Sequence, residues 1–343
     1  MLTDCTLLRV QSVYLLRNHI SHHTFTFSLY IIIAVFFSSC CAKLQMTDKG
    51  TIYTASSTLP QISATHQPGF YVKFPAQPYD RIGTPIVIEK SGGPFVQVDS
   101  TYPTMYFEQE KFTTKKSTYT NLIYRIHFSK VPFGLCNLNI TAGNNPGLLI
   151  IYTLNHTNKL ILITTVHTCG CYLAFFPTTD LQKPAYPNDW SFAPQSIYGY
   201  TLPGILPAHA SPPDQPYYIT LESGSHRISD ISNSITKTPD QITIQQMKIR
   251  PMEDLYYLPY KDKTISFFED VGRREGYVKN SSKILERLLI SWWAFDWHVG
   301  EDKAYGKDDT SKTPFYTSLK FWQRNSSDMK NFSQFLSYWG WKL

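Results

Sequence analysis

The chain has 343 residues and a net charge of +6, and 42% of its residues are hydrophobic and 15% aromatic. Such a chain can bury a substantial core, so the composition excludes a predominantly disordered protein. Basic residues are mixed with acidic ones, as where Arg273-Arg274 stand between Glu269, Asp270 and Glu275, and the sequence therefore predicts no nucleic-acid partner.

The first element along the chain is an apolar run from Phe25 to Phe37, and the residues just ahead of it carry only basic charge, at Arg9 and Arg17. At about 1.5 Å per residue, a helix of this length is shorter than the roughly 30 Å hydrocarbon layer of a membrane. The run is therefore predicted to be the core of an export signal that covers residues 1–39.

The end of the run, Phe37-Ser38-Ser39-Cys40, resembles the signal of bacterial lipoproteins, in which small residues precede a cysteine that is lipidated and becomes the first mature residue. The resemblance implies lipid on Cys40, attachment to a membrane, and an exported location on the periplasmic or cell-surface side. Two alternatives stay open: cleavage after Ala42 to give a secreted chain, and retention of the run as an anchor. No family is indicated for residues 42–343.

Residues 40–66 are polar and have no long hydrophobic period, which predicts a tether. A β-rich body is expected from 67 to 250. Its strand-like stretches are 70–74, 85–88, 122–128, 217–221 and 242–247.

Two aliphatic runs, 148–154 and 160–166, are separated by a short polar segment and predict a β-hairpin buried on both faces. Eight prolines between 184 and 216 exclude helix interiors and central strands there, so this stretch is predicted to be an ordered loop.

Residues 251–343 are predicted to be a helical C-terminal region, which makes the expected fold class α+β. Ser281 or Ser282 is expected to cap a first helix that ends at Gly300, and Ser326 or Ser327 a second. The apolar stripe of the first helix is Ile284, Leu285, Leu288, Leu289, Trp292 and Phe295, and that of the second is Met329, Phe332, Phe335, Leu336 and Trp339.

Six of the seven tryptophans follow residue 291. Two interpretations stay open for this Trp-rich region. One is a helical layer packed on the sheet, and the other is a surface that contacts lipid headgroups, where tryptophan is favoured.

The best candidate for chemistry is His167-Thr168-Cys169-Gly170-Cys171, at the end of a predicted buried strand. Two sulfurs and an imidazole suit a transition metal, and strand pairing could add His127 as a further ligand. If the strand continued, alternation would place His167, Cys169 and Cys171 on one face.

Three other roles remain for these residues. Cys136 could form a structural disulfide with Cys169 or Cys171; a bridge between Cys169 and Cys171 would be strained and redox-active; or a free thiol beside His167 could act as a nucleophile. A weaker constellation of possible metal ligands or acid-base groups is Asp296, His298, Glu301 and Asp302.

The usual motifs of serine hydrolases, zinc proteases, cytochromes c and phosphate-binding loops are absent from the sequence. We therefore expect an exported envelope protein that binds a partner or ligand. The alternative is a metal- or thiol-dependent enzyme or redox protein centred on His167, Cys169 and Cys171.

Overall fold

The computed structural model describes residues 49–55, 66–133, 139–208, 216–235 and 241–343. They belong to one compact unit, Met46–Leu343. The predicted export signal, the lipidation site Cys40 and the disulfide candidate Cys136 lie outside the described residues.

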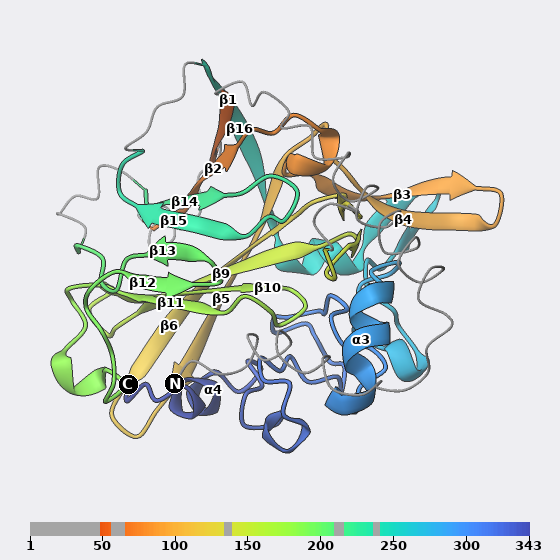
Figure 1. Ribbon diagram of the computed structural model, residues 1–343. Helices are drawn as coiled ribbons and strands as arrows, with labels where there is room; N and C mark the ends of the chain where they lie inside the picture. Colours follow the sequence, from red (N-terminus) through yellow and green to blue (C-terminus); the bar gives the residue numbers. More distant parts are fainter. Residues whose placement is uncertain (1–48, 56–65, 134–138, 209–215, 236–240) are drawn as a thin grey trace, which may run out of the picture. The chain divides into compact units, whose positions relative to one another are not determined.

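A ten-stranded sheet dominates this unit (Figure 1). In spatial order its strands are β11 (Ala174–Pro177), β10 (Leu160–His167), β9 (Gly147–Leu154), β6 (Thr118–His127), β5 (Thr104–Thr113), β16 (Gln241–Pro251), β1 (Lys49–Ala55), β2 (Gly69–Lys73), β14 (Tyr218–Leu221) and β15 (Ile228–Ser232). Neighbouring strands are antiparallel except for β5 with β16, β16 with β1, and β2 with β14.

Smaller elements surround the sheet. Four two-stranded ribbons pair β3 (Thr84–Lys90) with β4 (Gly93–Asp99), β7 (Lys130–Val131) with β8 (Gly143–Asn144), β12 (Gln195–Ile197) with β13 (Tyr200–Leu202), and β17 (Leu258–Tyr260) with β18 (Lys263–Ile265). The 3-10 turns are η1 (Pro78–Asp80), η2 (Lys183–Ala185), η3 (Met252–Tyr256), η4 (Gly272–Arg274) and η5 (Phe321–Gln323).

The predicted α+β class is wrong, because the fold is 41% strand and 13% helix. In the described part of the chain only α3 (Ile284–Ala294) and α4 (Phe332–Tyr338) are α-helices. In the C-terminal region the two helices are only 11 and 7 residues long. Between them the backbone turns at Gly300 and Gly306, whose φ angles are 76° and 133°. Left-handed and extended glycines of this kind interrupt helices.

The predicted hairpin is confirmed. β9 and β10 pair antiparallel, and every residue of both strands is buried. Alternate side chains of β9 enter two different cores: Leu149 and Ile151 pack with Phe315 and Phe335 of the C-terminal region, whereas Leu148 and Ile150 pack with the far strands of the sheet. Because each face of the strands has its own apolar core, the sequence shows continuous aliphatic runs without alternation.

Residues 49–55, which the sequence analysis assigned to the tether, form β1 inside the sheet. Lys49 stands opposite Gln241 of β16, and Tyr53 stands opposite Phe70 of β2. Tyr53 is fully buried. The tether prediction is therefore wrong for residues 49–55.

Both predicted C-terminal helices form, with different ends. α3 follows Lys283 and is terminated by Phe295, whose φ of 52° is left-handed, rather than by Gly300. α4 begins at Phe332, where the Asn331 side chain accepts a hydrogen bond from Gln334 N at 3.2 Å, and Gly340 follows its end. Among the helices described, none has the length and apolar character needed to cross a membrane.

Candidate functional site

The Cys-Gly-Cys segment lies in a tight turn directly after β10. The strand ends at His167, whose N–H donates to Cys171 O at 2.9 Å, while Gly170 N donates to His167 O at 2.7 Å. Gly170 has a φ of 89°, and a Cβ atom there would lie 2.1 Å from Tyr316 O. The turn therefore requires glycine at this position, and it ends the strand alternation on which the one-face prediction depended.

His167 supports the turn from within the core. It is 5% exposed, its Nε2 lies 3.1 Å from His226 O, and its ring packs edge-to-face on Tyr172. Burial, and then the positive charge of Lys283, lower the pKa of His167 to about 3. His167 is therefore a neutral ring held at a carbonyl near neutral pH.

Cys169 and Cys171, the thiol pair, are not joined by a disulfide bond. Cys169 is buried, Cys171 is half-buried, and their side chains share a hydrogen bond. Cys171 Sγ also lies 3.7 Å from Glu286 Oε1 of α3. Burial alone would raise both pKa values, but the hydrogen bond from Cys171 and the charge of Lys283 lower the pKa of Cys169, whereas the same hydrogen bond raises that of Cys171.

Three charged side chains, Lys283, Glu286 and Asp302, enclose the thiol pair and form the charge cluster. Lys283 Nζ lies 3.2 Å from Asp302 Oδ2, with side-chain exposures of 2% and 0%. The Thr168 hydroxyl donates to Asp302 Oδ1. Burial raises the pKa of Glu286, and a Cβ atom at Gly300 would collide with its carboxylate.

His127 is not part of this arrangement. Its Nε2 accepts a hydrogen bond of 2.9 Å from Arg125 Nε, and both side chains are fully buried. Burial, followed by the Arg125 charge, lowers the pKa of His127 well below its usual range. Within the described ranges, no three His, Cys, Asp or Glu side chains converge to hold a metal ion, so the predicted ligand set of His127, His167, Cys169 and Cys171 does not assemble.

The weaker constellation after α3 is divided among different partners. Asp296 accepts from the Tyr316 hydroxyl, and Glu301 pairs with Arg274 at 2.6 Å and with His298 Nδ1 at 3.4 Å. Only Asp302 joins the charge cluster.

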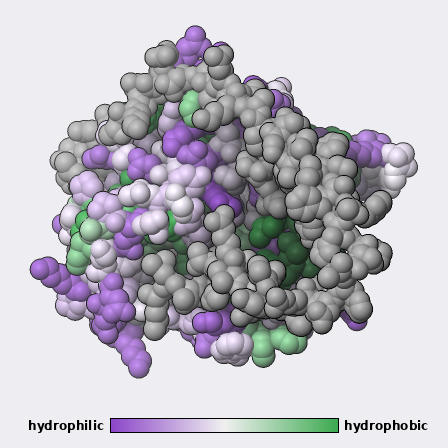
Figure 2. All heavy atoms as spheres, viewed as in Figure 1, coloured by the Kyte–Doolittle hydropathy of each residue, from purple (hydrophilic) through white to green (hydrophobic). Residues whose placement is uncertain are grey.

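The helix α3 is amphipathic, but its polar side faces the protein and most of its apolar side is exposed. Its buried residues are Glu286, Ser291 and Ala294, whereas its apolar stripe faces outward. We call the resulting surface the aromatic patch; its members, all exposed by 46–71%, are Ile284, Leu288, Leu289, Trp292, Trp293, Phe295, Trp297, Phe321 and Trp322. Figure 2 shows hydrophobic side chains grouped where α3 lies in Figure 1.

The patch continues beyond the helix. The ring of Phe295 contacts that of Phe321 with centroids 5.1 Å apart, and Phe321 contacts Trp322 at 5.0 Å. By contrast, the stripe of α4 is packed inward: Phe332, Phe335 and Leu336 are buried. The stripe of α4 therefore packs on the rest of the protein, whereas that of α3 is exposed.

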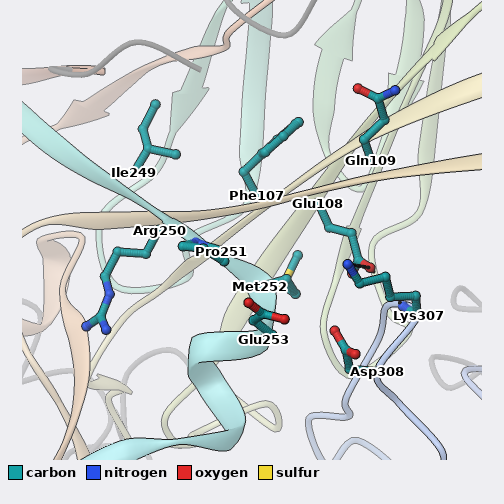
Figure 3. Close-up of a pocket in the computed structure, with 10 residues that line it drawn as sticks. All are labelled: Phe107, Glu108, Gln109, Ile249, Arg250, Pro251, Met252, Glu253, Lys307 and Asp308. Atoms are coloured by element: carbon teal, nitrogen blue, oxygen red, sulfur yellow. Dashed lines mark hydrogen bonds and ion pairs between the residues drawn. The ribbon is translucent and has the colours of Figure 1, made fainter. Parts of the chain in front are cut away.

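A cavity of about 380 Å³ opens between β5, β16 and the segment around Lys307 (Figure 3). Glu108 Oε1 accepts from Lys307 N at 3.1 Å, and Oε2 has no hydrogen-bond partner among the described residues. Burial, and then the neighbouring Glu110, raise the pKa of Glu108 to about 7. In Figure 3 the Glu108, Lys307 and Asp308 side chains point toward one another.

Sequence reasoning missed Lys283, Glu286 and Glu108. The first two carried a usable signal, because a lysine and a glutamate three residues apart stand off the apolar stripe of α3. Glu108 carried none, since Lys307 comes from a distant part of the chain.

Comparison of the chain with protein-family models, curated proteins and solved structures finds no match. The function must therefore be argued from the thiol pair, the charge cluster, the cavity and the aromatic patch.

Proposed function

We propose that this protein is an exported envelope protein that rests on a lipid surface through the aromatic patch. The observation that carries the proposal is the outward-facing apolar stripe of α3. Soluble monomers rarely expose contiguous apolar surface of this kind, and where they do it marks an interaction site.

The orientation of α3 has a local cause. Glu286 contacts Cys171 and lies in the field of Lys283, so the polar side of the helix is fixed inward. An 11-residue helix anchored by this side must present its opposite side, the leucines and tryptophans, to the surroundings. The patch is thus a consequence of the charge cluster.

The composition of the patch favours a lipid interface as its occupant. Four of its members are tryptophans, which prefer the headgroup level of a membrane because the indole is apolar with one polar N–H. The only carboxylate of α3, Glu286, is buried, while Arg287 on the helix and Lys320 beside Phe321 are basic. Anionic headgroups therefore meet no exposed acid on the helix.

The expected N-terminal attachment fits this arrangement. Two separate contacts with a bilayer hold a protein more firmly, and in a more defined orientation, than one contact. Lipid on Cys40, or the apolar run itself, would supply the first contact and the aromatic patch the second.

The test is depth-dependent quenching of tryptophan fluorescence in the full chain. The protein is reconstituted into phosphatidylcholine vesicles, with and without phosphatidylglycerol, that carry brominated acyl chains. We expect quenching that is stronger with phosphatidylglycerol and largely lost when Leu288 and Trp292 are both replaced by Ser.

The matched control replaces Tyr102 and Tyr257 by Ser; these aromatic residues are 64% and 63% exposed and lie outside the patch. The control is expected to be quenched like the parent chain. Equal quenching in the patch variant, or tryptophans that brominated lipid leaves unquenched in the parent, would refute the lipid contact even if the chain stays with the vesicles through its N-terminus.

A further inference from the structure

We propose that Cys169 and Cys171 form a dithiol–disulfide redox site that exchanges with a low-molecular-weight disulfide. The inference does not rest on the aromatic patch, because it uses only the turn after β10 and the charge cluster behind it.

The turn brings the two sulfurs together. Gly170 reverses the chain between them, and the thiols are hydrogen-bonded yet not cross-linked. Residues two apart in a turn have Cα atoms within the ~4.4–6.8 Å that a disulfide requires. A small ring closed across one glycine is strained, and strained disulfides are the readily reduced ones.

The two cysteines differ in solvent exposure, and this difference assigns them different roles in the exchange. Cys171 is the more exposed of the two residues: it is half-buried, whereas Cys169 is only 3% exposed. An external disulfide therefore meets Cys171 first, and Cys169 is placed to resolve the resulting mixed disulfide.

The charge cluster supplies what thiol exchange needs. Glu286 Oε1, 3.7 Å from Cys171 Sγ, is placed to accept its proton, and burial makes this carboxyl readier to hold one. Lys283 stabilises negative charge on Cys169. A purely structural thiol pair would require neither group, and burying them costs free energy.

The balanced reaction runs in two steps. Cys171 transfers its proton to Glu286 and attacks one sulfur of the external disulfide. The S–S bond of the external disulfide breaks as the mixed disulfide with Cys171 forms. The departing thiolate then takes the proton from Glu286. Cys169 then attacks the Cys171 sulfur and expels the second thiolate, and the proton lost by Cys169 passes to that leaving thiolate. The two cysteines lose two electrons and the external disulfide gains them.

The experiment uses the full chain in detergent with Cys5, Cys40, Cys41 and Cys136 replaced by Ser. The protein is incubated in glutathione and glutathione-disulfide mixtures, quenched in acid, and labelled with N-ethylmaleimide for mass spectrometry. We expect both labels to be lost together while the protein stays folded, as judged by circular dichroism.

Single variants identify the roles. Cys169→Ser is expected to accumulate glutathione on Cys171, and Cys171→Ser to remain unmodified on Cys169. Glu286→Gln is expected to slow formation of the mixed disulfide at least about tenfold, the lower range for loss of a positioned proton acceptor. Glu269→Gln, which removes a half-exposed carboxylate paired with Arg274, is the matched control and should leave the rate unchanged.

Three results would overturn the proposal. The first is a parent protein whose two thiols react only after unfolding. The second is a lasting glutathione adduct in the parent at the level of Cys169→Ser, which would mean that no resolution occurs. The third is stoichiometric zinc that protects both thiols in the folded chain.

Discussion

Lys283 and Asp302 form an ion pair inside the protein, with Nζ and Oδ2 3.2 Å apart and almost no solvent exposure of either side chain. Asp302 is held at the same time by the Thr168 hydroxyl, so the pair connects the N-terminal end of α3 to the turn that carries the thiols. The positions of the patch and of the thiol pair both depend on it.

Removal of one partner of this pair should be strongly destabilising. Lys283→Met removes the positive charge that faces the buried Asp302 and Glu286, and we expect a loss of about 3–5 kcal/mol in the free energy of unfolding from urea titration. Lys261→Met, which breaks an exposed pair with Glu89, should cost far less, because solvent screens that pair. The double variant Lys283→Met/Asp302→Asn should recover part of the loss; no recovery would contradict the pairing.

The turn between the cysteines can be tested with two glycines of equal φ. Gly170 and Gly199 both have a φ of 89°, but a Cβ atom at Gly170 meets Tyr316 O whereas one at Gly199 meets nothing within 4 Å. Gly199→Ala should lower the free energy of unfolding by about 1 kcal/mol, the cost of placing a side chain at a positive φ. Gly170→Ala should lower it clearly more. Thermal unfolding of both variants measures the difference in stability. Equal destabilisation would show that the backbone moves to avoid the contact between the new Cβ atom and Tyr316 O.

Two buried histidines should make the protein sensitive to acid. Burial is the chief cause that lowers the pKa of His167 and of His226 to about 3, from an ordinary 6.5. Between these pH values the unfolded chain binds more protons, so their contribution is complete above pH 6.5 and is lost progressively as the pH falls toward 3. The expected slope is up to about 1.4 kcal/mol per pH unit for each histidine.

Urea titrations between pH 4 and 7 test this dependence. His167→Gln keeps a donor for His226 O and should flatten the slope although it lowers stability overall. His156→Gln, at an exposed position in the β9–β10 turn, should leave the slope as in the parent. A parent whose stability is constant over this range would contradict the neutral, buried state of both rings.

Glu108 should act in the opposite direction. Its pKa of about 7 lies above the ordinary 4.5, so the folded state is penalised as the pH rises from 4.5 through 7, by as much as about 3 kcal/mol when the carboxylate is fully ionised. Glu108→Gln should therefore stabilise the protein above pH 7 and change little below pH 4.5. Glu253→Gln, an exposed residue at the same cavity, serves as the control.

The sequence alone predicted the elements that have a clear local pattern of apolar residues. The β9–β10 hairpin was predictable because aliphatic residues fill both faces, and the two helices were predictable from their apolar period. The orientation of α3 was not predictable, since the period identifies a stripe without saying whether protein or solvent covers it. That choice is made by Lys283 and Glu286, whose partners come from other parts of the chain.

The same reason explains the fold-class error and the missed β1. Residues 49–55 have an ordinary polar appearance, and their place in the sheet is determined by β16, which is far away in the sequence. Local patterns do not report pairings of this kind. The thiol segment was accessible to sequence reasoning as a candidate, because two cysteines after a predicted buried strand are visible in the sequence.

The parallel pairing of β1 with β16 also constrains when the protein can fold. β16 joins β1 to β5, so the two halves of the large sheet stay separate until residues 241–251 have been synthesised. High contact order of this type slows folding and prolongs the lifetime of open chains with unpaired strand edges. Nascent chains of this protein should therefore depend on chaperones, and any truncation before β16 should aggregate rather than fold in part.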